Sequence, residues 1–462
     1  MRFRLSLALL AGRVIGAAAR LSGRGGGTAL PGLAANRVYP ALLSEMTGRI
    51  PEGVILVSGT NGKTTTSRLL ALMLTSSGKR IVHNRTGSNL IRGIAATLVA
   101  SSHLDGRPVG AMGLFETDEA VLPGLLRQVR PRVVVLNNLF RDQLDRYGEL
   151  DSLYRSWEQA IRTLDPDVHL IVNADDPALA RLGELAPGPV TYFGVHSPDL
   201  ALAELPHAAD SGACPRCRMP LVYSAVYVSH LGEYHCSNCG FSRPQPDVLA
   251  TEIVLHGTTH TELTLCGLYG NHRLRMNVPG LYNVYNGLAA TAVAHRVRLP
   301  WEAVERGYLG FSAAFGRFER IHTEGRSVVL ALVKNPVGCN EVLRMLSSEP
   351  SSEPLLIVIN DQTADGRDVS WLWDADFELL ASMEGPIITS GLRAADMAVR
   401  LKYAGIDAAK IHVEERIPAA LRRAMASTSV GGTLRVMPTY TAMLALRAHM
   451  GELGWVEPYW EE

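Results

Sequence analysis

The sequence feature that most constrains the fold is a glycine-containing turn between an apolar run and a helical pattern. Residues 58–66 read Ser-Gly-Thr-Asn-Gly-Lys-Thr-Thr-Thr and directly follow the apolar run 54–57. In such a turn, glycines let backbone N–H groups close around a phosphate, the lysine reaches the outer phosphates, and a threonine hydroxyl serves Mg²⁺. A chance Gly-Lys-Thr in an ordinary turn is the alternative, and the flanking strand and helix patterns count against it. The turn therefore predicts an ATP site formed by Gly59, Thr60, Asn61, Gly62, Lys63, Thr64 and Thr65.

Strand and helix patterns alternate twice along the chain, which predicts two α/β units. Such alternation favours a mostly parallel sheet with helices on both faces, and 462 residues are too many for one ordinary core. The strand candidates are 54–57, 81–83, 109–115, 133–137, 169–172 and 190–193 in the first unit, and 328–333, 355–359, 386–389, 410–413 and 434–437 in the second. We expect an N-terminal segment at 1–50, an ATP-binding unit at 51–315 with a module inserted at 205–245, and a C-terminal unit at 316–462.

Charge and lysine content narrow the possible functions. The chain has 45 basic and 45 acidic residues, so no global field attracts nucleic acid or anionic lipid. A nucleic-acid-binding ATPase is the alternative from another class, and the absence of a basic stripe interleaved with aromatic residues counts against it. We therefore expect no nucleic-acid partner. Lysine is rare, which gives weight to the two lysines at candidate functional positions, Lys63 and Lys334.

The first 30 residues predict a basic amphipathic helix. Arg2 and Arg4 precede an apolar stretch that begins at Leu5, as in a signal peptide. However, Arg13 and Arg20 interrupt this stretch, and no apolar run is long enough to cross a bilayer. The helix is expected either to lie on the protein or to touch a membrane surface. With an ATP site in the same chain, we expect a cytoplasmic protein at the periphery of the inner membrane face.

Four of the six cysteines form two Cys-x2-Cys pairs, which predict a structural zinc site. Cys214 and Cys217 form one pair, Cys236 and Cys239 form the other, and 18 residues separate the pairs. Two such turns can present four thiolates to one tetrahedral ion, which leaves no open position for catalysis. Disulfides are the alternative and are untypical of a cytosolic chain.

No metal-binding or catalytic role is expected for the other two cysteines or for the histidines between the Cys-x2-Cys pairs. His230 and His235 lie between the two pairs and are expected to be surface or packing residues rather than ligands. Cys266 and Cys339 are expected to be buried thiols. Neither stands in a nucleophile turn with a histidine partner, so the chain shows no glutaminase of its own.

Polar residues at the ends of later elements extend the predicted ATP site. Glu116 ends a strand candidate, and a carboxylate there faces the crevice in which open α/β sheets bind ligands, so it is a candidate Mg²⁺ ligand with Thr64. Asp118 and Glu119 are alternatives to Glu116, and a simple surface acid is a further one. Asn173 also follows a strand candidate.

A helix pattern that begins near residue 281 carries two further candidates. Asn283 and Asn286 are three residues apart, so they share a helical face from which an adenine edge can be read. Each alone is equally typical of a cap or turn residue. Taken in this order along the chain, however, the polar motifs form a recognisable set.

In this order the motifs resemble those of the Mur ligase family, which activates carboxylates with ATP. The likeness rests on the shortened phosphate loop, Glu116, the Asn137-Asn138 segment, the Asn173-Ala174-Asp175-Asp176 run and the two helical asparagines. Two departures narrow the match. Gln143 stands where histidine is common, and residues 141–160 contain no lysine that could be carbamoylated. We therefore expect the metal to be bound in a different way from that of the usual amino-acid-adding enzymes.

The cysteine pairs and the segments 140–148 and 360–371 are similar to those of the MurT family, the ligase subunits of lipid II isoglutaminyl synthases. The resemblance implies an α/β fold with a central P-loop ATPase domain, an inserted zinc ribbon and a Rossmann-like C-terminal domain. It also implies ATP-dependent amidation of the D-glutamate α-carboxylate of lipid II through an acyl phosphate. Ammonia would come from a GatD-like glutaminase partner in a heterodimer, at the inner membrane face.

The resemblance also implies roles for single residues. Asp368 would complete a Cys-His pair of the partner, and Arg317 would contact ATP at the hinge between the units. From the sequence alone, Asp368 is more typical of a helix N-cap or a loop acid. Lys334 would contact the acyl phosphate or pair with a carboxylate. An amino-acid-adding peptidoglycan or polyglutamyl ligase is the alternative enzyme, and Gln143 and the missing lysine count against it.

Overall fold

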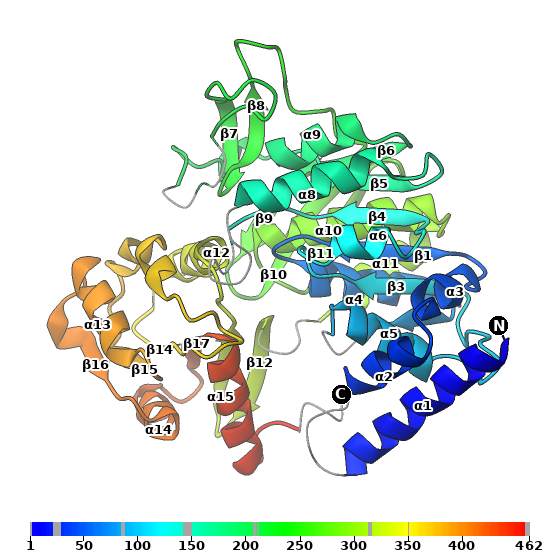
Figure 1. Cartoon of the computed structure of the whole chain (residues 1–462). Helices are drawn as coiled ribbons and strands as arrows, with labels where there is room; N and C mark the ends of the chain where they lie inside the picture. Colours follow the sequence, from blue (N-terminus) through cyan, green and yellow to red (C-terminus); the bar gives the residue numbers. More distant parts are fainter. Residues whose placement is uncertain are drawn as a thin grey trace.

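Two large sheets and one small hairpin organise the molecule (Figure 1). The structure is a computed structural model, and it describes residues 2–21, 29–84, 88–141, 150–206, 209, 212–312, 317–349 and 351–457. The first large sheet has nine strands and the second has six, while the small sheet consists of β7 (Val222–Val228) and β8 (Leu231–His235).

The nine-stranded sheet carries the phosphate loop on its central strand. In spatial order its strands are β11 (His272–Met276), β10 (His260–Gly267), β9 (Val248–His256), β6 (Val190–Val195), β5 (His169–Asn173), β4 (Val133–Leu136), β1 (Val54–Ser58), β3 (Met112–Glu116) and β2 (Ile81–His83). Strands β9 to β2 run parallel, and β10 and β11 extend the sheet in antiparallel fashion. Every residue of β1 is buried, as a central parallel strand requires.

Helices cover both faces of this sheet, and alternate residues of β1 point into two different cores. Ile55 and Val57 pack toward one face, while Val54 and Leu56 pack toward the other. The first face is covered by α4 (Lys63–Ser76), α10 (Leu281–Arg296) and α11 (Trp301–Gly310). The second is covered by α1 (Arg2–Leu21), α2 (Leu30–Val38), α3 (Leu42–Gly48), α5 (Ile91–Ala100), α6 (Leu122–Leu126), α8 (Leu150–Arg162) and α9 (Pro177–Leu185).

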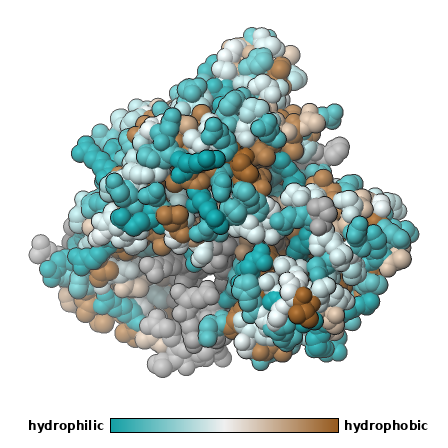
Figure 2. Space-filling view, turned by 180° about the vertical axis from the view of Figure 1, so that it is seen from behind, coloured by the Kyte–Doolittle hydropathy of each residue, from teal (hydrophilic) through white to brown (hydrophobic). Residues whose placement is uncertain are grey.

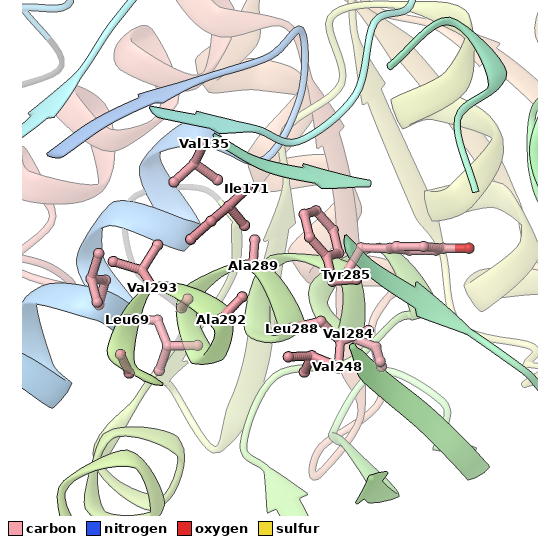
Figure 3. Close-up of a cluster of buried hydrophobic side chains, with 14 of the residues drawn as sticks. Leu69, Val135, Ile171, Val248, Val284, Tyr285, Leu288, Ala289, Ala292 and Val293 are labelled. Carbon is pink, nitrogen blue, oxygen red and sulfur yellow. The ribbon is translucent and has the colours of Figure 1, made fainter. Parts of the chain in front are cut away.

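Helix α10 is buried along most of its length. Figure 3 shows Val284, Leu288 and Val293 of α10 together with sheet residues such as Val135 and Ile171. Its buried side chains are apolar almost all round, which is the pattern of a helix enclosed by other elements. This core fixes the start of α10 beside the phosphate loop.

The six-stranded sheet forms a second α/β unit. In spatial order its strands are β12 (Arg317–Thr323), β13 (Arg326–Ala331), β17 (Thr433–Pro438), β14 (Leu355–Val358), β15 (Ile387–Ser390) and β16 (Ile411–Val413). All neighbours except β12 and β13 are parallel. One face packs on α12 (Pro336–Ser347), α13 (Ala394–Tyr403) and the 3₁₀ helices η2 (Ser370–Trp373) and η3 (Phe377–Leu380). The other face packs on α14 (Ile417–Ser427) and α15 (Tyr440–Glu452).

The predicted parallel α/β architecture is confirmed, with two differences in detail. The strand expected at 109–115 begins only at Met112. The sequence patterns also left several strands unassigned, namely β9 and the antiparallel strands β10 and β11 of the large sheet, and β7, β8 and β12 elsewhere. The predicted unit boundaries remain predictions, and Gly316 lies outside the described residues.

Of the two thiols predicted to be buried, one is buried and the other is not. Cys339 is fully buried in the core under α12. Cys266 is only partly buried, because burial alternates along β10 and Cys266 falls on its more exposed face.

Candidate active site

The phosphate loop joins β1 to α4 through two glycines with positive φ. Gly59 has φ 141° and Gly62 has φ 83°, a region that favours glycine. A Cβ atom on Gly62 would lie 1.9 Å from Asn286 Oδ1, so another side chain would displace the start of α10. Glycine at this position therefore lets α10 approach the N-terminus of α4 closely, and a helix N-terminus that follows a glycine-containing turn is the arrangement that binds phosphate.

Lys63 of the loop is paired with a carboxylate from the segment that follows β3. Its Nζ lies 2.7 Å from Glu119 Oε2 and also donates to the carbonyl oxygens of Gly59 (2.5 Å) and Thr60 (3.1 Å). Lys63 and Glu119 are both buried, so the pair balances two charges away from water. Trp157 Nε1 donates to the carbonyl oxygen of Glu119 at 2.7 Å and so fixes the segment that carries the carboxylate.

Thr64 and Glu116 lie together beside the loop. The Thr64 hydroxyl donates to Glu116 Oε2 at 2.7 Å. Asn84, which follows β2, binds both backbone groups of Glu116, since its Nδ2 donates to the carbonyl oxygen and its Oδ1 accepts from the N–H, each at 2.9 Å. A hydroxyl and a carboxylate at the mouth of a phosphate loop are the oxygen donors that Mg²⁺ prefers, so this pair fits the ion.

A network of amides and a hydroxyl supports the back of the loop. Asn137 Nδ2 donates to Thr66 Oγ1 at 2.9 Å, and Thr66 Oγ1 lies 3.4 Å from Asn286 Oδ1. Asn173 donates to the carbonyl oxygen of Asn137 at 3.0 Å. Asn286 also donates to Asn283 Oδ1 at 3.2 Å, so the two asparagines share one face, as the sequence predicts. Their predicted contact with the nucleotide remains a prediction.

The C-terminal unit reaches the loop through the start of α12. Asn335 and Asn61 exchange two side-chain contacts, at 3.1 and 3.4 Å. Lys334 Nζ lies 3.4 Å from the carbonyl oxygen of Thr60. Asn335 also caps α12 by accepting from Gly338 N at 2.9 Å. The structure therefore brings Lys334 to the phosphate loop although 274 residues separate it from Thr60.

Two other predicted positions are described only in part or not at all. Arg317 begins β12, and the structure describes its backbone but not its side chain. Gln143 lies outside the described residues, so the departure from the Mur ligase pattern at this position remains a sequence observation.

A buried carboxylate ties the module at 205–245 to the large sheet. Asp175 Oδ1 accepts from Arg243 Nε at 2.6 Å, and its Oδ2 accepts from the Tyr285 hydroxyl at 2.7 Å and from Val195 N at 2.9 Å. Burial raises the pKa of Asp175, and Arg243 opposes this shift. Because Asp176 caps α9 with its own carboxylate, the two neighbouring aspartates hold separate structural positions.

The four paired cysteines form one cluster. Their Sγ atoms all lie within 4.8 Å of one another, with 3.6 Å between Cys214 and Cys239 and 3.5 Å between Cys217 and Cys236. A tetrahedral Zn–S₄ site with bonds of about 2.3 Å has S–S edges of about 3.8 Å, so the cluster fits zinc. His230 is buried and packs edge-on against Phe140 rather than joining the thiols, as predicted.

Asp368 lies apart from the phosphate loop, in the segment between β14 and η2. Its side chain is exposed, and its Oδ1 accepts from Ser370 N at 2.8 Å. This hydrogen bond lowers the pKa of Asp368. Nearby residues Asp361, Arg367 and Arg393 line an open cavity of about 700 Å³. The carboxylate is therefore presented at the surface beside a polar hollow.

Sequence reasoning missed two parts of the site. Glu119 was considered only as an alternative to Glu116, whereas the structure pairs it with Lys63. Asn84 was not considered, although it follows a strand candidate in the same way as Asn173 does. The rule that identified Asn173 could therefore have identified Asn84.

Comparisons with known proteins agree with this geometry. Residues 57–242 match the model of the Mur ligase middle domain, and residues 332–443 match the model of the MurT ligase C-terminal domain. The lipid II isoglutaminyl synthase (glutamine-hydrolyzing) subunit MurT of Streptococcus pneumoniae is 34% identical over 451 residues, which cover 97% of each chain. The protein of the same description from Staphylococcus aureus strain COL is 31% identical over 420 residues, covering 90% of this chain and 91% of the relative.

A solved structure extends the likeness to the fold. MurF from Acinetobacter baumannii superposes with a TM-score of 0.66 at 20% identity, covering 91% of this chain and 81% of that chain. At this identity the likeness concerns the fold alone.

Proposed function

Since the chain belongs to the MurT family of Mur ligases, we propose that it amidates the D-glutamate α-carboxylate in the stem peptide of lipid II. Its relatives over almost the whole chain are subunits of lipid II isoglutaminyl synthase, so it is an ATP-dependent carbon–nitrogen ligase of peptidoglycan synthesis. The nitrogen comes from glutamine through a partner subunit of the glutaminase class, GatD-like, in a heterodimer.

The observation that carries the proposal is the meeting of the two family-matched regions at one phosphate loop. Asn61 belongs to the matched middle region and Asn335 to the matched C-terminal region, and their amides are in contact. Lys334 approaches Thr60 at the same place. A carboxylate held between these regions would lie next to the γ-phosphate of a nucleotide in the loop.

The loop residues would supply binding and charge stabilisation. We assign the phosphates of ATP to the loop amides and Lys63, and Mg²⁺ to Thr64 and Glu116. When bound, Mg²⁺ neutralises charge on the phosphoryl group that is transferred. Lys63 would leave Glu119 and turn to the phosphates, while Lys334 would approach the acyl phosphate. The acyl phosphate is the electrophile that ammonia then attacks, with phosphate as the leaving group.

Asp368 would act toward the partner subunit rather than toward ATP. An exposed carboxylate with a lowered pKa can orient a histidine of another chain and stabilise its cation. It would thereby complete a cysteine–histidine pair that hydrolyses glutamine. The contact surface is proposed to lie on the C-terminal unit, around the polar hollow beside Asp368.

Zinc is proposed to have a structural role. Cys214 and Cys236 are buried and share a small core with Phe241, Tyr234 and Ala180 of α9. An ion held by four thiolates has no open position for a substrate, so it would stabilise this module.

Replacing Cys236 by serine is expected to release zinc and to lower the unfolding temperature by about 5 °C or more, because binding energy of the ion contributes to folding. Zinc content by elemental mass spectrometry and calorimetric unfolding would measure the two effects. Cys266→Ser is the matched control, since Cys266 is outside the cluster and should keep one zinc per chain. Unchanged zinc in the Cys236 variant would contradict the assignment.

The proposed reaction is tested with the purified heterodimer, lipid II, ATP and glutamine labelled with ¹⁵N in its side-chain amide. We expect the label in the product amide and one ADP formed per amide. Turnover without ATP consumption would refute the proposal. Incorporation of a labelled amino acid instead of the amide nitrogen would favour the alternative, an amino-acid-adding ligase.

A further inference from the structure

Helix α1 has apolar residues on two sides, and only one of these sides is buried. Leu5, Ala8 and Leu9 are fully buried and belong to the core under the large sheet. Gly12 lies so close to α2 and α5 that a Cβ atom would come within 2.9 Å of the Pro31 carbonyl oxygen and 3.0 Å of Val99 Cγ1. One face of α1 is therefore firmly packed, and its remaining apolar residues need a different explanation.

The other side of α1 exposes a continuous apolar stripe. Phe3, Leu7, Leu10 and Val14 are 80%, 47%, 48% and 58% exposed. Their spacing of four, three and four residues places them on one helical face. The neighbouring helix α2 exposes Leu30, Leu33 and Val38. Both helices lie at the outer edge of the molecule (Figure 1), and hydrophobic side chains appear at this edge, the lower left, in the view from behind (Figure 2).

Positive charge is concentrated in the same part of the chain. The whole chain is neutral, but its first 44 residues contain no aspartate or glutamate, and the first acid is Glu45. The arginines of this segment are Arg2, Arg4, Arg13, Arg20, Arg24 and Arg37. Arg4 and Arg37 are exposed beside the apolar residues. Arg13 instead binds the carbonyl oxygens of Val99 and Ser102 and holds α1 against α5.

We propose that the exposed faces of α1 and α2, called here the α1–α2 outer surface, dock on an anionic lipid bilayer. A helix with exposed large apolar residues and only basic charges is typical of helices that lie in the membrane interface. Anionic headgroups attract the arginines, and the apolar side chains enter the acyl boundary. The part of the chain that the structure describes holds no helix able to cross a membrane, so this surface would rest on the bilayer.

Charge complementarity favours a bilayer over a second protein as the occupant. A second copy of this chain would bring two acid-free segments together, and their arginines would repel one another. The benefit of docking on a bilayer rests on the proposed function, because a lipid-linked substrate has its reactive peptide near the headgroups. Docking would keep the chain where this substrate is found.

The test is sedimentation of the full-length chain with vesicles. We expect binding to vesicles of phosphatidylcholine with phosphatidylglycerol and much weaker binding to pure phosphatidylcholine. The triple variant Leu7→Ser, Leu10→Ser, Val14→Ser should lose at least about tenfold in partitioning to the anionic vesicles. Arg4→Glu with Arg37→Glu should lose the preference for anionic lipid. A matched control replaces three exposed valines elsewhere, Val254, Val413 and Val430, by serine and should bind like the parent chain.

Two results would overturn the proposal. One is equal sedimentation of the parent chain and the triple variant. The other is a triple variant that changes the oligomeric state in solution but not vesicle binding, which would assign the surface to a second copy. Amidation of a water-soluble stem peptide, measured in parallel without vesicles, tests the proposed function separately. Loss of vesicle binding with intact amidation would therefore concern the α1–α2 outer surface alone.

Discussion

Replacing Lys63 by alanine should remove amidation with either nitrogen source, glutamine or free ammonia. In the proposed reaction the Lys63 ammonium group stabilises the phosphoryl group that is transferred, and activation of the carboxylate by ATP precedes nitrogen attack with both nitrogen sources. Loss of one preorganised stabilising group costs about 10² to 10³ in rate in comparable sites. The measurement is ADP and amide formation with each nitrogen source.

The Lys63 prediction needs a control for folding, because the lysine is paired in a buried site. Its removal leaves Glu119 buried without its cation, which destabilises the surrounding structure. The double variant Lys63→Met, Glu119→Gln removes both charges together. Its unfolding temperature should therefore be closer to that of the parent chain than the unfolding temperature of Lys63→Ala is. Lys79→Ala, which breaks an ion pair with Glu52, should retain activity. Activity of the folded double variant with either nitrogen source would contradict the role of Lys63.

Replacing Asp368 by asparagine should lower the rate of amidation with glutamine but not the rate with free ammonia. Glutamine-dependent amidation is expected to fall by at least about 100-fold, because an amide cannot stabilise a histidine cation as a carboxylate does. Amidation with free ammonia should remain at the parent rate, since Asp368 lies outside the phosphate loop. Asparagine has nearly the same shape and can still accept from Ser370 N, so the loop should keep its conformation.

Asp407 is a close structural match for this experiment. It is also an exposed aspartate whose carboxylate accepts from the N–H two residues on, Ala409 N, at the start of a 3₁₀ helix, η4 (Ala408–Lys410). Asp407→Asn should keep both activities. If Asp368→Asn loses activity equally with glutamine and with ammonia, its role is structural and the partner assignment is wrong.

The fold was predictable where strands are buried on both faces. Such strands read as short apolar runs between helical segments, and β1, β4 and β5 follow this pattern closely. Strands β9 to β11 were missed for the opposite reason. They are partly exposed at the edge of the sheet, so polar residues interrupt their apolar pattern.

The phosphate loop and the cysteine cluster were predictable because their chemistry needs residues at short, fixed spacing. Cys214 and Cys217 lie on one turn, and the loop glycines stand three apart. The pairing of Lys63 with Glu119 and of Asn61 with Asn335 could not be read in the same way. These contacts join residues 56 and 274 positions apart, and their partners are set by the packing of whole elements.

The amide contact between Asn61 and Asn335 has a consequence for the order of events. Both side chains are neutral, so each hydrogen bond contributes only about 1 kcal/mol net and is readily replaced by water. The C-terminal unit is thus held weakly at this point, and it also carries Asp368. A swing of that unit would take the proposed partner subunit along with it. Delivery of ammonia and entry of the nucleotide would then both depend on the same movement of the C-terminal unit.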